Sequence, residues 1–532
     1  MGGLRFLRIG VLAAAAAALY FVLQGGRAFA DAPVNIPAGS SFYDDIERLE
    51  VKGLISSAIF STRPFTRAEG ARLVREADEN RRQSRHPFVS LRAKGSLACG
   101  GACPERSEGA RAGAGALIER LKNEFRYELS DSDAPIFIKP AGGFYLKHIY
   151  AGKTPYFAGI NNNGDTLRKG QNERAGFVFR AGLFDAMSVY LNPEYRADDD
   201  NADARVVHGY MAFRAGGIDI EAGKDSMWWG SGYHGGLLMT NNAEPFRMVK
   251  ATVSSPAALP SVFSRLGLFK PTVFIARLEK ERDFPRARLL GMRLDFKPTD
   301  RFQFALSRVF IFGGRGRRAL SFADWVSVLL ATDKAEHDPA SPIDGDQIVS
   351  IDASYVYVNE GRPFLPFSGI KLYTEWGAED SSGRTRTPSG RADICGFFID
   401  EPLWIKNTDF RLEWANTGRS ARYGPLWYEH GVYTSGYRYF GRFIGHHMGG
   451  DAQDLFLMVR YHMQNGASMA LEHDKERSGI HGGAPAVKRW SALDISYPVL
   501  PSAVMRLIFG WGIEKTTLGA DTVLSLNISF AL

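Results

Sequence analysis

Residues 524–532 read Leu-Ser-Leu-Asn-Ile-Ser-Phe-Ala-Leu, so that apolar and small polar side chains alternate to the last residue of the sequence. Successive side chains of a β-strand point to opposite faces, and the pattern therefore predicts a strand with one apolar face. Soluble proteins seldom end in such an unprotected amphipathic strand. A membrane barrel does, because its last strand closes the sheet and leaves no free edge. Outer-membrane barrels most often end in Phe, whereas here Phe530 lies two residues before the final Leu532.

The same period of two residues recurs through residues 134–532, which we assign to one large domain. Residues 410–414, Phe-Arg-Leu-Glu-Trp, carry apolar and aromatic side chains on one face and charges on the other. We therefore predict an all-β transmembrane barrel of roughly 16 to 20 antiparallel strands, with about 18 favoured. A soluble β-sandwich or propeller also alternates, but the sequence has no blade-length repeat. Further alternating stretches are residues 292–297, 455–462 and 505–514.

The N-terminus has the three-part layout of a secretory signal, which we assign to residues 1–30. Arg5 and Arg8 precede an apolar run, and Ala28-Phe29-Ala30 provides a small-x-small cleavage site. An uncleaved anchor is the alternative, but the run is short and rich in Ala for a membrane span. We expect cleavage after Ala30 and delivery of the mature chain to the outer membrane.

In residues 31–133, apolar side chains recur at helical spacing and do not alternate at every second residue. We predict that these residues form a small helical region on the periplasmic side. Three amphipathic helices are expected, over residues 42–52, from Thr66 toward Ala77, and over residues 116–129. Residues 95–115 are biased toward Gly, Ala and Ser and have no apolar periodicity. They are predicted to be a flexible insertion within this region.

The charge balance is basic, with a formal net charge of +7 and a sequence pI near 9.1. No Lys/Arg block or reader motif of a nucleic-acid-binding protein is present, so nucleic acid is not an expected partner. The most basic segment, residues 313–318, lacks the Lys-Ser/Thr ending of a phosphate loop and is interpreted as a turn or a contact to anionic sugar. Acidic polysaccharide or lipopolysaccharide would match the sign of the charge.

Cysteine and histidine spacings do not predict a metal site or a cofactor. Cys99 and Cys103 are close enough to form a disulfide in an oxidising compartment, which would leave Cys395 alone, but the other ligands of a zinc site are missing nearby. His446 and His447 are adjacent, and neighbouring side chains on a strand point to opposite faces. They cannot both bind one ion without a turn.

Carboxylate groups in the sequence have structural interpretations that we prefer to catalytic ones. Asp44 and Asp45 lie in the first turn of a predicted helix, where acidic side chains interact favourably with the helix dipole. Glu375, Glu379 and Asp380 could suggest glycosidase acids, but lumen walls and loops of barrels are commonly acidic. No catalytic residue is nominated, and we predict that the protein is not an enzyme.

The most unusual stretch of the chain is residues 223–245, where Trp228, Trp229, Tyr233 and His234 lie among glycines. Aromatic side chains in this setting could form a platform that stacks on sugar rings. An aromatic girdle beside a loop that constricts the barrel is an equally good interpretation.

This stretch and several other motifs, in their order along the chain, resemble the capsule-assembly outer-membrane proteins called Wzi. The resemblance extends over nearly the whole mature chain. The matching segments are residues 42–49 with 53–55, 117–125, 229–230 with 240–245, 410–417, and 436–442 with 444–446.

The resemblance implies a large outer-membrane barrel with an N-terminal helical bundle on the periplasmic side. It also implies a lectin-like factor that associates capsular polysaccharide with the cell surface, and not an enzyme. The chain departs from the family pattern in two places. One is the insertion at residues 95–115, and the other is Glu244, which stands where a basic residue is expected in the Asn-Asn-Ala-x-Pro motif.

The predicted function is therefore binding or anchoring of capsular or extracellular polysaccharide, with many weak contacts adding up to strong retention. The other expected partners are outer-membrane lipid or lipopolysaccharide and the polysaccharide export machinery. A porin-like diffusion channel is the alternative function. Candidate polysaccharide contacts are Trp228, Trp229, Tyr233, Arg438 and Arg442.

Overall fold

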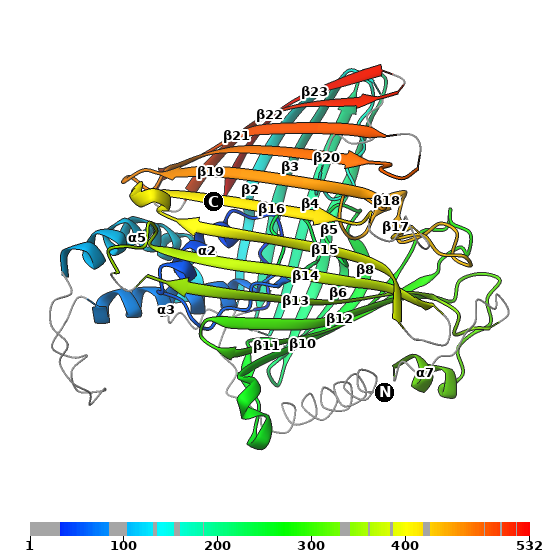
Figure 1. The fold of residues 1–532 in the computed structure, drawn as a ribbon, viewed down its shortest axis with the longest axis horizontal. Coiled ribbons are helices and arrows are strands. Elements are labelled where there is room, and N and C mark those ends of the chain that lie inside the picture. Colours follow the sequence, from blue (N-terminus) through cyan, green and yellow to red (C-terminus); the bar gives the residue numbers. More distant parts are fainter. Residues whose placement is uncertain are drawn as a thin grey trace.

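The chain forms a closed antiparallel β-barrel with helices at one end and long loops at the other, in a computed structural model (Figure 1). The predicted signal sequence lies outside the described residues. Those residues are 32–84, 104–130, 136–153, 160–184, 186–329, 341–359, 362–382, 387–418, 426–482, 485–500, 503–517 and 519–531.

Strands that are consecutive in the sequence are adjacent in the barrel. The last strand, β23, pairs with β2 and closes the barrel, as the alternation at the end of the sequence predicts. Nineteen strands form the described barrel. The short strand β9 and strand β8 both pair with β10 and share one position, so the barrel has eighteen strand positions, in agreement with the prediction. The strands are β2 (Ile136–Ala151), β3 (Gly170–Leu183), β4 (Met187–Asp198), β5 (Ala202–Ala215), β6 (Ile218–Asp225), β8 (Phe246–Val253), β9 (Ala257–Ala258), β10 (Leu268–Arg277), β11 (Arg288–Thr299), β12 (Phe302–Phe312), β13 (Asp346–Val358), β14 (Gly369–Ser382), β15 (Thr387–Asp400), β16 (Thr408–Asn416), β19 (Ala452–His462), β20 (Ser468–Ser478), β21 (Ala486–Leu500), β22 (Ala503–Thr516) and β23 (Gly519–Ala531).

Side chains that alternate between polar and apolar in the sequence point alternately into the lumen and toward the outer surface of the barrel. In β16, Arg411 and Glu413 are buried in the lumen, while Phe410 and Leu412, which alternate with them, are only partly covered. Large apolar side chains remain exposed on the outer surface of many strands, as expected for a band that contacts lipid. Examples are Leu146, Val189, Met211, Val249, Val273, Ile351, Leu372, Trp376, Val459, Leu471 and Phe509.

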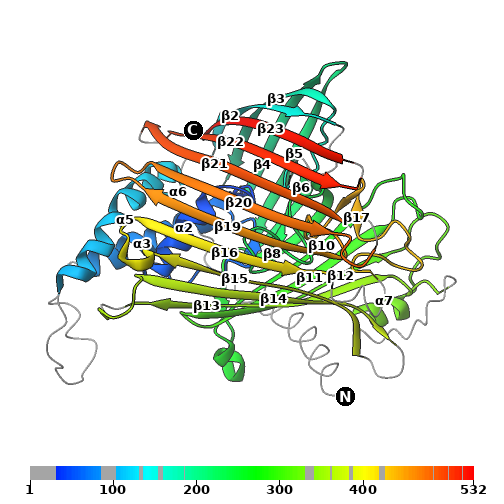
Figure 2. The same cartoon turned by 45° about the horizontal axis from the view of Figure 1, so that its top comes forward.

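A helical unit, which we name the plug, is formed by residues 32–84 and 104–130 and enters one end of the barrel (Figures 1 and 2). Apolar side chains of its helices form a separate core that includes Phe42, Leu73 and Phe125. Its elements are α2 (Phe42–Val51), β1 (Thr62–Arg63), α3 (Arg67–Ser84), α5 (Pro104–Glu124) and α6 (Arg126–Leu129).

Helix α5 differs from the sequence-based prediction, which starts a helix near residue 116 and makes residues 95–115 irregular. The helix begins at Pro104 and so includes the second half of that segment. Ala has the highest helix propensity and Pro is well accommodated in the first turn, so this composition supports a helix even without apolar periodicity. Residues 95–103, with Cys99 and Cys103, lie outside the described residues.

Ion pairs join α2 to the inner wall of the barrel. Nζ of Lys297 lies 2.8 Å from Oε1 of Glu50, and Nζ of Lys371 lies 3.0 Å from Oε1 of Glu47. The guanidinium of Arg411 also pairs with Glu47. Each of these side chains is almost completely buried. Because an unpaired buried charge is costly, these pairs specify where the plug lies.

The longest connections lie at the end of the barrel opposite the plug (Figure 1). Two of them contain short strands: β7 (Trp228–Trp229) precedes β8, and the pair β17 (Arg438–Tyr439) and β18 (Arg442–Phe443) precedes β19. The remaining elements are η1 (Ser261–Leu266), α7 (Phe322–Leu329) and η3 (Pro402–Trp404). No helix among the described residues is long and apolar enough to cross a membrane.

Candidate functional site

The connection between β6 and β8, residues 226–245, folds into the barrel, and we name it the first inward loop. Trp229 has no exposed surface, and Trp228 is 4% exposed with its indole N–H donating to the Gly232 carbonyl. Strand β7 in this loop pairs with β1 of the plug, so Thr62 faces Trp229 in register. Neither indole ring therefore has a face free for stacking on a sugar in this conformation.

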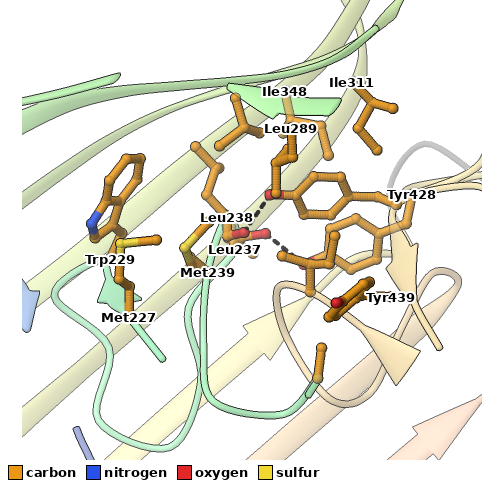
Figure 3. Packing of buried hydrophobic residues seen from close by; sticks show 14 of the residues in the cluster. Met227, Trp229, Leu237, Leu238, Met239, Leu289, Ile311, Ile348, Tyr428 and Tyr439 are labelled. Carbon is orange, nitrogen blue, oxygen red and sulfur yellow. Dashed lines mark hydrogen bonds between the residues drawn. The ribbon is translucent and has the colours of Figure 1, made fainter. Parts of the chain in front are cut away.

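Residues 426–451 form a second inward loop that packs against the first. The Tyr428 hydroxyl donates to the Leu237 carbonyl at 2.6 Å, and the Tyr437 hydroxyl donates to the Leu238 carbonyl at 2.7 Å. Figure 3 shows Tyr428 and Tyr439 on one side of Leu237, Leu238 and Met239, with Trp229 and Met227 on the other side of the cluster. The two loops therefore share one apolar core at this end of the barrel.

Carboxylates of the barrel wall accept hydrogen bonds from the backbone of both loops. Glu413 accepts from the N–H groups of Tyr233 at 2.6 Å and His234 at 3.0 Å. Glu375 accepts from Leu237 N–H at 3.2 Å, and Glu379 accepts from Tyr428 N–H at 2.8 Å. These contacts give Glu375 and Glu379, considered above as possible glycosidase acids, a structural role.

Tyr233 lies inside the barrel between the plug and the wall. The Arg411 guanidinium carbon is 3.9 Å from the centre of its ring, and its hydroxyl donates to Asp44 of α2 at 3.5 Å. Burial raises the pKa of Tyr233, and the nearby Asp44 carboxylate raises it further. Its phenol is thus neutral and joins the first inward loop to the plug.

The acids Asp44 and Asp45 of α2 also have structural partners. Nη1 of Arg460 lies 2.7 Å from Oδ2 of Asp44, and Nη2 of Arg120 lies 2.5 Å from Oδ2 of Asp45. The first pair joins the plug to β19, and the second joins two helices of the plug. Sequence spacing could not identify these partners, which lie far along the chain.

The two candidate arginines lie on the hairpin of β17 and β18 at the loop end of the barrel. Arg438 pairs with Glu429, and its guanidinium carbon is 4.3 Å from the centre of the Phe443 ring. Nη2 of Arg442 donates to Oδ1 of Asn162 at 2.8 Å. Both side chains are partly exposed. The register pairs Arg438 with Phe443 and Tyr439 with Arg442, so the two cations lie on opposite faces of this hairpin, which is part of the second inward loop.

Phe440 connects β17 to β18 and was not identified from the sequence. Its side chain is 50% exposed, and its backbone has a φ of 48°, a left-handed conformation that is uncommon for a bulky residue. The neighbouring Gly441, with a φ of 76°, is the local signal of a tight turn. An exposed aromatic ring in the turn of a hairpin that carries two arginines is a suitable element for binding a charged sugar.

Two histidines of the second inward loop are buried beneath the hairpin. Burial lowers the pKa of His446 to about 3 and the pKa of His447 well below its ordinary value, with nearby His234 acting in the same direction. Both imidazoles are therefore neutral near pH 7. The side chain of His447 lies together with those of His234, Asp454 and Asp474.

A sequence model of the family described as "Capsule assembly protein Wzi" matches residues 152–518. The chain belongs to the Wzi family. The resemblance noted in the sequence is thereby confirmed, and the closed β-barrel is the fold that it implies. Glu244, the departure from the family motif, pairs with Lys224 of β6, with 2.5 Å between Oε1 and Nζ.

Two known proteins illustrate the relation to the Wzi family. An uncharacterised 55.8 kDa protein from the cps region of Klebsiella pneumoniae is 25% identical over 165 residues, a match that spans 31% of each chain. The solved structure of Wzi from Escherichia coli is 17% identical, with a TM-score of 0.65 over 94% of this chain and 99% of that one. That protein is described as a carbohydrate-binding β-barrel of the outer membrane involved in group 1 capsule assembly.

Proposed function

We propose that this barrel binds capsular or extracellular polysaccharide at the cell surface and holds it there, as a lectin-like factor and not as an enzyme. Membership of the Wzi family supports this proposal, as does the description of Wzi from Escherichia coli as a carbohydrate-binding barrel. The observation that carries it is the exposed ring of Phe440 in the turn of the hairpin whose two strands carry Arg438 and Arg442; we name these three side chains the hairpin surface.

The hairpin surface has the chemistry needed for an acidic glycan. An exposed aromatic ring packs against the C–H face of a sugar ring, and guanidinium groups donate paired hydrogen bonds to carboxylates. Glu429 fixes the orientation of Arg438 and leaves other N–H groups of its guanidinium for a ligand. Arg315 and Arg318 are exposed in the neighbouring connection, where Tyr433 donates to the Gly313 carbonyl.

The orientation in the membrane follows from the lengths of the connections. Bacterial outer-membrane barrels have short periplasmic turns and long extracellular loops, so the plug would face the periplasm and the hairpin surface would face outward. The apolar outer surface would contact lipid, including lipopolysaccharide. Polysaccharide export machinery would deliver the glycan to the loop end.

A diffusion channel is less well supported, because the plug and both inward loops lie within the barrel. Backbone pairing between β1 and β7 joins plug to loop. Hydrogen bonds from backbone N–H groups of the loops to Glu375, Glu379 and Glu413 fix the loops to the wall. An open pore would require these contacts to break.

Deletion of the gene tests the proposal in the cell. We expect the glycan to appear in the medium while its total synthesis stays unchanged. The wild-type gene should restore attachment, whereas a gene encoding R438A/R442A should not. A matched control is R301A/K406A, which removes two positive charges from exposed turns at the plug end. Unchanged cell-bound glycan in the deletion strain would disprove the proposal.

A further inference from the structure

Four side chains from distant parts of the chain meet below the hairpin surface, and we name them the His/Asp cluster. One comes from each inward loop, and two come from the neighbouring wall strands β19 and β20. Their ligand atoms all lie within 4.8 Å of one another. The members are His234, His447, Asp454 and Asp474.

The cluster is almost completely removed from solvent. The side chains of His447, Asp454 and Asp474 are between 2% and 3% exposed, and that of His234 is 12% exposed. Both ring nitrogens of His447, Nε2 of His234 and both carboxylate oxygens of Asp474 lack a hydrogen-bond partner. Buried polar atoms are normally paired, so these atoms are available to a ligand bound within the cluster.

The His–Asp distances within the cluster are too long for good hydrogen bonds. Nε2 of His234 is 3.6 Å from Oδ1 of Asp474 and 3.8 Å from Oδ2 of Asp454. Nε2 of His447 is 3.5 Å from the same Asp454 oxygen. Direct N–H···O hydrogen bonds need about 2.7 to 3.2 Å, so the two imidazoles lie near both carboxylates without a short hydrogen bond to either.

These separations suit a metal ion at the centre. In a tetrahedral zinc site with bonds of about 2.0 to 2.2 Å, neighbouring ligand atoms lie about 3.3 Å apart. A shift of less than about 1 Å by each side chain would give that arrangement. Two imidazoles and two carboxylates are also ligand types that zinc commonly accepts.

We propose that the His/Asp cluster binds one divalent transition-metal ion, with zinc as the best match. The ion would neutralise Asp454 and Asp474, two carboxylates brought close together in a buried setting. Another acid beside them, Glu476, already has a partner in Lys488, at 2.7 Å. The bound ion would replace the hydrogen bonds that the cluster lacks, since an uncompensated buried charge is very unfavourable.

The surroundings hold His234 in place for this role. Glu413 accepts from the backbone N–H of His234, and the Asn161 side chain donates to the His234 carbonyl at 2.8 Å. The His234 ring stacks on Phe456 with 4.2 Å between ring centres. A bound ion would join both inward loops to the barrel wall and so fix the base of the hairpin surface.

The adjacent His446 is not a member of the cluster. Its Nε2 is 3.9 Å from Oδ2 of Asp454, and its Nδ1 accepts from the backbone N–H of Met448 at 3.4 Å. The expectation that His446 and His447 do not both bind one ion is compatible with this site, because the second imidazole comes from the other loop. The proposal replaces the sequence-based expectation that the chain has no metal site.

Zinc binding by the full-length protein tests the proposal. The protein is purified in detergent without a histidine tag, treated with a chelator, and titrated with zinc sulfate by calorimetry, with bound metal measured by mass spectrometry. The variants are D474N and H447Q. The matched control is H473Q, which removes the exposed imidazole next to Asp474 on the outer face of β20.

We expect one zinc ion per chain in the wild type and in H473Q, with zinc raising the Tm of both. Affinity should fall at least 10-fold in D474N and H447Q, and zinc should no longer raise their Tm. Heat-dependent mobility on a denaturing gel checks that each variant is folded. The proposal fails if the wild type binds no zinc after chelation, or if folded D474N binds zinc as tightly as the wild type.

Discussion

Thr62 of β1 lies opposite Trp229 of β7, and the adjacent Gly230 N–H donates to the Ser61 carbonyl at 2.9 Å. These contacts join the plug, which enters from one end of the barrel, to a loop that folds in from the other end. The plug and the first inward loop are therefore connected to each other inside the barrel. Each part also has its own contacts to the barrel wall, so removal of either one should leave the other inside the barrel.

Ion conductance tests the closed lumen. In a planar bilayer, we expect the wild-type protein to show little conductance, and deletion of residues 32–130 to open the barrel only partly because both inward loops remain. Deletion of those residues together with the first inward loop should give large, steady channels. Porin-like conductance of the wild type would favour the alternative of a diffusion channel.

Trp229 provides a test of whether the paired tryptophans stabilise the fold or contact the glycan. The ring is fully buried and packs against Phe274 with 5.3 Å between ring centres. Replacement by Ala should lower the free energy of unfolding by about 3 to 5 kcal/mol, measured by urea titration. Polysaccharide binding by the folded variant should stay near the wild-type level.

Trp404, which is 59% exposed in a turn at the plug end, is the matched control. W404A should change the urea midpoint only slightly. A W229A protein with wild-type stability and lost glycan binding would show that Trp229 contacts the glycan directly.

Glu47 should make docking of the plug dependent on pH. Burial alone would raise the pKa of Glu47, but Arg411 and Lys371 outweigh burial and lower it to about 2. A lowered carboxyl pKa contributes stability above the unfolded value of 4.5, and this contribution is lost as the pH falls from 4.5 toward 2. The loss should be about 3 kcal/mol.

Urea titrations of the wild type and E47Q between pH 7 and pH 2 measure this effect. The variant should be less stable at pH 7 and should lose less stability on acidification. Parallel pH profiles for the two proteins would mean that Glu47 does not contribute.

The sequence predicts the barrel well because strand alternation is a local property. Side chains such as Arg411 and Leu412 alternate in the sequence as they do between lumen and outer surface. The closing role of the last strand follows from the same pattern. Helix α5 is longer than predicted because the high propensity of Ala supports a helix that has no apolar stripe.

The candidate site is less predictable because its contacts join distant parts of the chain. The stretch around Trp228 and Trp229 has the composition of a sugar platform, but its inward direction depends on Thr62 and Glu413. His234 meets His447 only after both loops fold into the barrel. Arg438 and Arg442 were identified from motifs, whereas Phe440 between them was overlooked.

The most direct test of the account is binding of the host's own purified polysaccharide to the purified barrel, measured by biolayer interferometry. Wild type and the control R301A/K406A should bind with equal affinity. R438A/R442A should bind at least 10-fold more weakly, a loss of about 1.4 kcal/mol or more, and F440A should also be weakened. Equal binding by wild type and R438A/R442A would contradict the hairpin surface as the glycan site, and absence of binding by the wild type would contradict the proposed function.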